Sequence, residues 1–230
     1  MPAAPSSLHA IPCEPQQVRG ICEPVTAVVD LDAPSQGIAC GGDRLLGLDL
    51  RSCCAASDHW IRGGDVVAVY EPDDPRHLRA TALWRHRATP GIATWELIAS
   101  ATTSRRESDT SLAVVSNVAT KEVLWGCPGS EGLRWENADS TTAVCILIRR
   151  PETHGGSVVL AVHPADSRGL LVRRDSDRTT VECWLFSAAA EKGVLFRGRA
   201  LAALGPRAED TSWAERLWDE FVGSPPMLTT

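Results

Sequence analysis

The sequence predicts an all-β protein, an antiparallel β-sandwich that carries one helix at its C-terminal end. Three observations predict this class. From residue 25 onward, short apolar or alternating runs recur, and turns rich in Gly, Pro and Asp separate them. The intervals between the runs are too short for helices, a pattern typical of antiparallel sheets rather than of βαβ units. Hydrophobic residues make up 43% and charged residues 23% of the 230-residue chain, which is enough apolar surface for a sizeable core.

The alternation is clearest between residues 94 and 100, where Trp95, Leu97 and Ala99 fall on one face of a strand. Other runs are continuous and apolar, as in a strand buried on both faces. The predicted strands are residues 25–31, 45–50, 65–70, 78–84, 94–102, 112–118, 123–125, 142–149, 157–163, 169–173, 180–188 and 194–203.

Three parts follow from this pattern. Residues 1–24 contain five prolines and form an arm predicted to be extended or disordered. Residues 25–210 form the all-β domain. Residues 211–223 form an amphipathic helix, because Ser212 and Glu215 have capping-box spacing and Trp213, Leu217 and Phe221 recur on one face.

An internal duplication is a further hypothesis. Residues 63–78 align without gaps on residues 155–170, and eight of the sixteen positions are identical. We therefore predict two related β halves, with repeats at 63–118 and 155–204. The two halves would then share one order of strands.

Charge and composition bear on partners and location. The net charge is −6 with a pI near 5.5, and no run of Lys or Arg is longer than two, so nucleic-acid binding is not expected. No apolar stretch approaches the roughly 18 residues of a membrane helix. The first residues lack the pattern of a secretory signal, and we expect a soluble, cytoplasmic protein with no membrane contact.

The eight cysteines show no C-x-x-C spacing, and we expect reduced, structural thiols, with Cys145 and Cys183 as small core residues. The six histidines show no metal-binding spacing, so neither a metal nor a cofactor is expected. No phosphate-binding loop or dinucleotide fingerprint occurs.

No catalytic signature is intact. Ser57, Asp58 and His59 are contiguous, whereas a catalytic triad is assembled in space, and we interpret them as a polar turn. Paired acids could form a glycosidase-like site only if the fold brings them together. These pairs are Glu71 with Asp73 and Asp74, Glu136 with Asp139, and Asp175 with Asp177.

The chain has eight tryptophans against three phenylalanines and one tyrosine. Trp84 and Trp95 belong to neighbouring predicted strands, and an exposed pair could stack on a sugar while Arg85 and Arg87 donate hydrogen bonds. Core packing is the commoner use of tryptophan and is the interpretation favoured for both rings. The oligomeric state is left open.

Three functions remain at this point. The first is a non-catalytic binding or interaction module, with carbohydrate or a protein as the partner. The second is a carbohydrate-active enzyme that uses loop carboxylates. The third is a structural or protein-interaction role.

Overall fold

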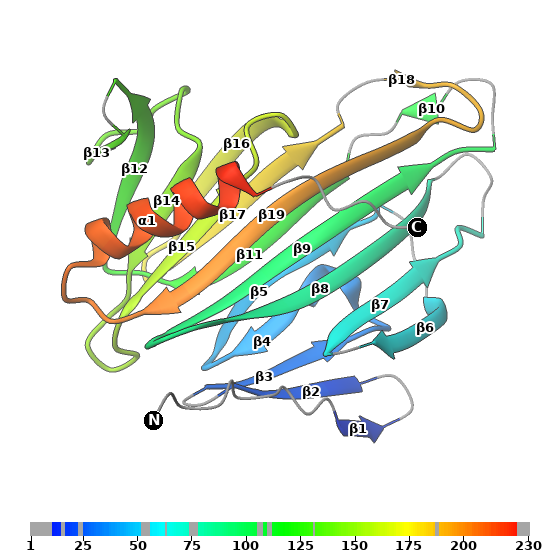
Figure 1. Cartoon of the computed structure of the whole chain (residues 1–230), viewed down its shortest axis with the longest axis horizontal. Helices are drawn as coiled ribbons and strands as arrows, with labels where there is room; N and C mark the ends of the chain where they lie inside the picture. Colours follow the sequence, from blue (N-terminus) through cyan, green and yellow to red (C-terminus); the bar gives the residue numbers. More distant parts are fainter. Residues whose placement is uncertain are drawn as a thin grey trace.

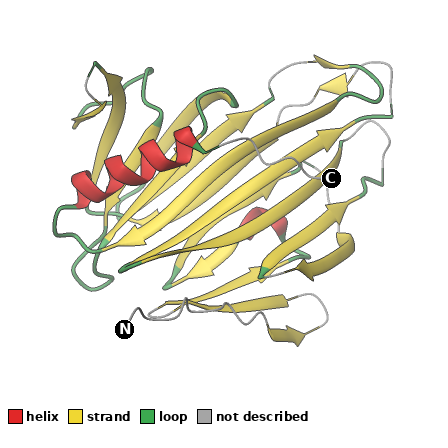
Figure 2. Ribbon diagram, viewed as in Figure 1, coloured by secondary structure: helices red, strands yellow, loops and turns green. Residues whose placement is uncertain are grey.

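The computed structural model describes residues 11–14, 17–22, 25–51, 56–62, 64–73, 78–104, 108–109, 112–130, 132–186 and 189–224. They form two large antiparallel sheets, and a helix near the C-terminal end lies against one of them (Figure 1). Figure 2 shows how strongly strand dominates over helix. The predicted all-β class is therefore confirmed.

Eight strands form the first sheet. In spatial order they are β1 (Ile11–Glu14), β2 (Gln17–Cys22), β3 (Val25–Asp30), β4 (Ile38–Cys40), β5 (Asp43–Asp49), β11 (Leu112–Ala119), β17 (Arg178–Leu185) and β16 (Ser167–Arg174). A short 3-10 helix, η1 (Pro34–Gln36), connects β3 to β4. It packs closely on β5, where a side chain at Gly47 would collide with the carbonyl of Ser35.

Nine strands form the second sheet. In spatial order they are β13 (Gly132–Glu136), β12 (Glu122–Gly129), β14 (Cys145–Arg149), β15 (Ser157–Val162), β19 (Leu195–Gly205), β9 (Ile92–Thr102), β8 (Arg79–Thr89), β7 (Asp65–Tyr70) and β6 (Ala56–Arg62). A separate pair joins β10 (Ser108–Asp109) to β18 (Ala189–Ala190).

The main core lies between the two sheets. Alternate residues of each strand point inward, for example Leu97 and Ala99 of β9, and they pack against inward residues of the first sheet such as Leu48 and Val114. Cys183 belongs to this core, and Cys145 to a smaller cluster beneath the C-terminal helix, so the predicted burial of both thiols is confirmed.

The helix α1 (Asp210–Gly223) covers part of the opposite face of the nine-stranded sheet (Figure 1). Trp213 and Leu217 pack on Leu147 of β14 and Val159 of β15. Trp218 and Phe221 pack on a neighbouring cluster that includes Leu201 of β19. Because the core covers one face of β15 and α1 covers the other, every residue of β15 is buried.

The predicted start of the helix needs one correction. The helix begins at Asp210 and its N-cap is Glu209, with no hydrogen bond from a capping side chain, so Ser212 lies inside the first turn. Glu215 accepts a hydrogen bond from the backbone N–H of Leu133 at 3.1 Å. The capping box is therefore not formed, because tertiary contacts with β13 engage the glutamate.

The predicted duplication is not confirmed. The matched strands β7 and β15 both lie in the nine-stranded sheet. The strands that follow β7 stay in that sheet as β8 and β9, whereas β16 and β17 follow β15 into the eight-stranded sheet. The local sequence match therefore reflects two similar strands with different onward paths.

Part of the arm predicted to be extended or disordered forms extended edge strands, and one predicted turn is instead a strand. Residues 11–14 and 17–22 of the predicted arm pair as β1 and β2 at the edge of the eight-stranded sheet. Ser57, Asp58 and His59 lie within the edge strand β6, not in a turn. Among the described helices, neither has the length and apolar character that a membrane crossing requires.

Candidate functional site

The register between β8 and β9 decides where the predicted site residues lie. Trp84 lies opposite Leu97, and Trp95 lies opposite His86, so the two tryptophans share one face of the sheet. That face is the inner one: Trp84 is 3% exposed and Trp95 is 4% exposed, and both belong to the core between the sheets. Both rings are therefore core residues, as the favoured interpretation predicts, and the alternative of an exposed platform that stacks on a sugar is wrong.

Arg85 and Arg87 lie on the opposite, outer face, because neighbouring side chains of a strand alternate between faces. Arg85 forms a bidentate ion pair with Asp65 of β7, in which its Nε lies 2.9 Å and 3.0 Å from the two carboxylate oxygens. The hydrogen bond that Arg85 donates to Asp65 is the main reason why the pKa of Arg85 is raised, and the charge of Glu96 adds to it. The fold thus separates the predicted arginines from the predicted tryptophans.

Glu96 lies at the centre of this outer face and has no exposed surface. Arg87 approaches it from β8, with its Nη2 2.8 Å from Oε2 of the glutamate. Arg199 approaches from β19, with its Nη1 3.8 Å from Oε1. The side chains of Asp65, Arg85, Arg87, Glu96 and Arg199 constitute what we call the outer site.

Burying a carboxylate is costly unless positive charge or hydrogen bonds compensate it. Among the described residues, the contacts of Glu96 are ion pairs, and no hydrogen bond of good geometry reaches either carboxylate oxygen. The neighbouring Thr94 is also fully buried on the same face. Glu96 therefore acts as a fixed negative centre that orients two guanidinium groups.

The C-terminal end of α1 borders the outer site and holds Arg199. The Nη1 of Arg199 donates to Oγ of Ser224 at 3.0 Å, and its guanidinium lies 5.3 Å from the ring centre of Phe221. Asp166 accepts a hydrogen bond from the backbone N–H of Arg199 at 3.0 Å. These contacts fix one arginine of the outer site in position.

The sequence analysis identified Arg85 and Arg87 but missed Asp65, Glu96 and Arg199. A signal for Glu96 was present, since the alternation that places Trp95 and Leu97 on one face places Glu96 on the other. No such signal exists for Arg199, which lies more than one hundred residues away and reaches the site only because β19 pairs with β9.

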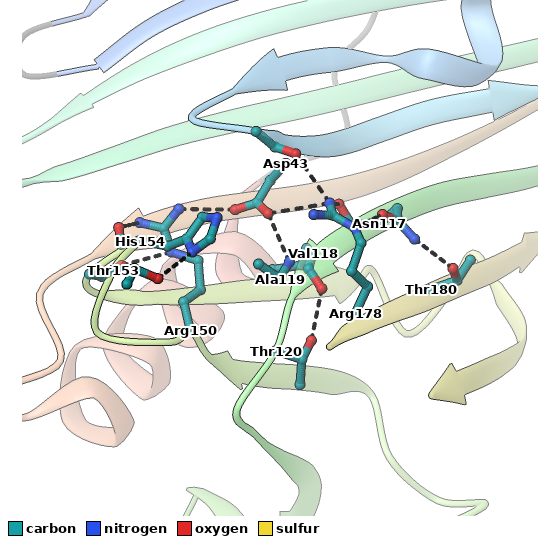
Figure 3. A network of polar contacts seen from close by, with 12 residues as sticks. Asp43, Asn117, Val118, Ala119, Thr120, Arg150, Thr153, His154, Arg178 and Thr180 are labelled. Carbon is teal, nitrogen blue, oxygen red and sulfur yellow. Dashed lines mark hydrogen bonds and ion pairs between the residues drawn. The ribbon is translucent and has the colours of Figure 1, made fainter. Parts of the chain in front are cut away.

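A second polar cluster lies elsewhere and joins the two sheets (Figure 3). Asp43 of β5 accepts a hydrogen bond from Nη1 of Arg150 at 2.9 Å and another from the backbone N–H of Ala119 at 2.8 Å. Arg178 lies 3.5 Å from the same carboxylate.

The remaining donors of Arg150 are also engaged, by the carbonyls of His154 and Gly155. Because the polar groups of Arg150 and Asp43 have partners and both side chains are buried, this cluster has the character of a structural link. It connects the end of β14 to the start of β5.

Several of the paired acids of the turns contact arginines in the part of the chain that the structure describes. Glu71 forms an ion pair with Arg79, Glu136 with Arg134, and Asp139 lies 3.5 Å from Arg174. Asp74 lies outside the described residues. Within the described ranges, no three His, Cys, Asp or Glu side chains are grouped as metal ligands would be.

No protein-family model matches the chain, and no curated protein sequence matches it significantly. Solved structures resemble its fold. Heparan sulfate lyase HepC from Pedobacter heparinus superposes with a TM-score of 0.52 at 9% identity, over 87% of this chain and 36% of that chain. The galactosidase domain of an alpha-galactosidase-sucrose kinase, AgaSK, superposes with a TM-score of 0.51 at 8% identity, over 86% of this chain and 42% of that chain. A galactose mutarotase-like protein from Lactobacillus casei superposes with a TM-score of 0.49 at 9% identity, over 82% of this chain and 99% of that chain.

At these identities the likeness shows the fold alone. The chain spans less than half the length of the first two proteins. The fold is therefore a β-sandwich of a kind that also occurs in carbohydrate-related proteins, and the outer site is the candidate functional site on it.

Proposed function

We propose that this chain is a carbohydrate-binding protein and that the outer site is where the sugar binds. The observation that carries the proposal is the convergence of Arg87 and Arg199 on the buried Glu96. Arg199 is itself buried, so Arg87 is the arginine of this pair that reaches the surface. A guanidinium group held in place by a buried charge presents hydrogen-bond donors in a fixed geometry, and fixed donors reduce the entropic cost of binding.

The exposed fractions indicate which residues would contact the sugar. Arg87 has a side chain that is 32% exposed, and Arg85 and Asp65 are 22% and 20% exposed. Guanidinium groups donate to sugar hydroxyl and carboxylate oxygens, and carboxylates accept from hydroxyl groups. Glu96 itself, being fully buried, is a positioning residue.

Charge favours an acidic sugar over a neutral one. The outer site contains three arginines and two carboxylates, an excess of one positive charge, in a chain whose net charge is −6. The names of two fold neighbours, a heparan sulfate lyase and a galactosidase domain, are compatible with a carbohydrate partner.

The test is binding to an array of neutral, uronic-acid-containing and sulfated oligosaccharides, followed by titration calorimetry with the best ligand. We expect retention of acidic oligosaccharides, weaker binding at high salt, and at least a tenfold loss in Arg87→Ala, since a charge-assisted hydrogen bond contributes roughly 1.5–3 kcal/mol. Arg173→Ala is the control, because Arg173 pairs with Glu182 on the other sheet.

Two results would contradict the proposal. One is an array on which the wild-type protein retains no oligosaccharide. The other is an Arg87→Ala variant that is folded, by circular dichroism, and binds as tightly as the wild type.

A carbohydrate-active enzyme is the second candidate, because the strand registers place Asp65 and Glu96 beside Arg85 on one face of the sheet. Incubating the retained oligosaccharide with the protein distinguishes the two functions. New reducing ends or an altered sugar, absent in Asp65→Asn, would favour the enzyme.

A further inference from the structure

The edge strand β6 is the most exposed strand of the nine-stranded sheet. Among the described residues it pairs with β7 alone, and it is the last strand in the order of the sheet. Six of its seven residues are exposed, including two large apolar side chains, Trp60 at 44% and Ile61 at 38%. An open edge with apolar side chains is a template for pairing with another strand.

The stretch that could pair is short and well defined. The ladder between β6 and β7 shifts register between Ala56 and Asp58, and it is regular from Asp58 to Arg62. Trp60 lies at the centre of this five-residue stretch. Asp58, Trp60 and Arg62 share the outer face of the sheet, because they alternate with His59 and Ile61.

The charged residues of this stretch are arranged so that two antiparallel copies of it would place opposite charges across from each other. If two copies of β6 pair antiparallel about a twofold axis at Trp60, Asp58 of each copy lies opposite Arg62 of the other. Among the described residues neither side chain forms an ion pair, and Asp58 accepts a hydrogen bond from the backbone N–H of its neighbour His59. Opposite charges directly across a strand pair are stabilising.

The backbone supports the same register. Arg62 and Asp65 flank a two-residue connection, so they form the hydrogen-bonded pair that closes the β6–β7 hairpin. The even-numbered residues of β6 therefore bond to β7, and the odd-numbered residues direct their N–H groups toward the open edge. The N–H of His59 donates to Oδ1 of Asp58 at 2.8 Å, and in the dimer it would bond to the second copy instead. In the twofold register His59 lies opposite Ile61 of the second copy, and these two residues would exchange backbone hydrogen bonds. Asp58 and Arg62 then form a pair without backbone hydrogen bonds, in which side chains approach most closely.

The edge strand β16 of the other sheet provides a contrast. It carries Arg168, Arg173 and Arg174 and no acidic residue, so a second copy of β16 would be repelled. Charge complementarity thus favours β6 over β16.

We propose that β6 is the interface with a second copy of this chain, and that the dimer joins the two nine-stranded sheets edge to edge. Because residues opposite each other in antiparallel strands share a face, the two outer sites would lie on the same side of the continuous sheet. This proposal does not depend on the ligand of the outer site.

The test measures the mass of the full chain in solution by sedimentation equilibrium between 1 and 200 µM. We expect a dimer for the wild type. Asp58→Arg and Arg62→Asp each place like charges opposite each other twice, and each should weaken the dimer about tenfold or more. Mixing the two variants restores both ion pairs, so the mixture should form a dimer although neither variant does alone.

Two control variants separate this interface from general effects of charge, and a third variant tests the backbone pairing. Asp219→Arg and Arg216→Asp make the same changes at exposed positions of α1 and should leave the dimer intact. Ile61→Pro removes an N–H that the dimer uses and β7 does not, so it should give a folded monomer.

The proposal fails if the wild type is a monomer at 200 µM, in which case the edge is free or serves a different protein. It also fails if Asp58→Arg and Arg62→Asp form homodimers as strong as the wild type. A mixture of these variants that does not associate would equally overturn it.

Discussion

The indole Nε1 of Trp84 donates a hydrogen bond to the carbonyl oxygen of Leu46 at 3.1 Å, and this bond joins the two sheets through the core. Leu46 has a positive φ of 54° and lies at an irregularity where β5 pairs with β11. Its N–H donates to Oγ of Ser116 at 3.0 Å. Both polar groups of this buried backbone position are therefore satisfied by side chains.

Replacing Trp84 should therefore lower stability in two steps. Trp84→Phe removes the donor and leaves the Leu46 carbonyl unsatisfied, at an expected cost of about 1–3 kcal/mol in the free energy of unfolding. Trp84→Ala adds a cavity, for a total of about 3–5 kcal/mol. Urea denaturation measures both, and Leu171→Val at an exposed position of β16 should change stability by less than about 0.5 kcal/mol. Equal stability of Trp84→Phe and the wild type would show that the bond to Leu46 contributes nothing.

The buried pair of Asp43 and Arg150 should behave as a coupled unit. Arg150→Met leaves the Asp43 carboxylate buried without its main partner, and we expect a loss of about 3–5 kcal/mol. Adding Asp43→Asn removes the buried charge, so the double variant should be more stable than Arg150→Met alone. Lys121→Met, which breaks an exposed pair with Glu152, is the control and should cost less than about 1 kcal/mol. Additive losses in the double variant would contradict a coupled pair.

Asp210 should make the docking of α1 sensitive to acid. Burial alone would raise the pKa of Asp210, but hydrogen bonds from Arg149 and Ser157 outweigh it and hold the pKa below its ordinary value of 3.8. A lowered pKa contributes stability above about pH 4, and this contribution disappears as the pH falls through the lower, folded-state pKa.

Asp210→Asn should therefore be less stable than the wild type at pH 7, and the difference should shrink below pH 4. Near-ultraviolet circular dichroism of Trp213 and Trp218 follows the docking during denaturation. Asp219→Asn, on the exposed side of the same helix, is the control. A difference that stays constant down to pH 2 would argue against the role of this carboxylate.

His86 should contribute a second pH dependence, near neutrality. Its ring packs edge-on against Trp95 on the inner face, with centres 6.1 Å apart, and burial lowers the pKa of His86 below its ordinary value of 6.5. Below pH 6.5 the unfolded chain binds a proton at this histidine before the folded chain does, so stability falls as the pH decreases toward the folded-state pKa.

Denaturation midpoints between pH 5 and pH 8 test this expectation. The wild type should lose stability toward pH 5, and His86→Gln should lose less over the same range. His154→Gln, at an exposed turn, is the comparison and should follow the wild type. Parallel curves for His86→Gln and the wild type would assign the pH dependence to other groups.

Strands and the helix could be predicted from the sequence where local patterns of apolar residues define them. The expected segment 65–70 coincides with β7, and the expected helix at 211–223 differs from α1 by one residue. Apolar periodicity and turn residues carry this information locally. The edge strands β6 and β13 were missed. Six of the seven residues of β6 are exposed and show no apolar alternation, and β13 has only five residues.

The residues of the outer site were likewise predictable only in part from the sequence. Arg85 and Arg87 were predicted as binding residues, and alternation along β9 implies an outward Glu96. The pairing of Arg199 with this site depends on β19 lying beside β9, a contact between strands about one hundred residues apart. No local pattern encodes such a pairing.

The sequence by itself determined the class of fold, most of its strands and the single helix, because the period of apolar residues follows directly from backbone geometry. It also determined that Trp84 and Arg85 face opposite sides of their strand. Only the tertiary structure decided which side is the core. That choice depends on which strands pair and on what covers each face, and it placed the tryptophans between the sheets and the arginines around Glu96.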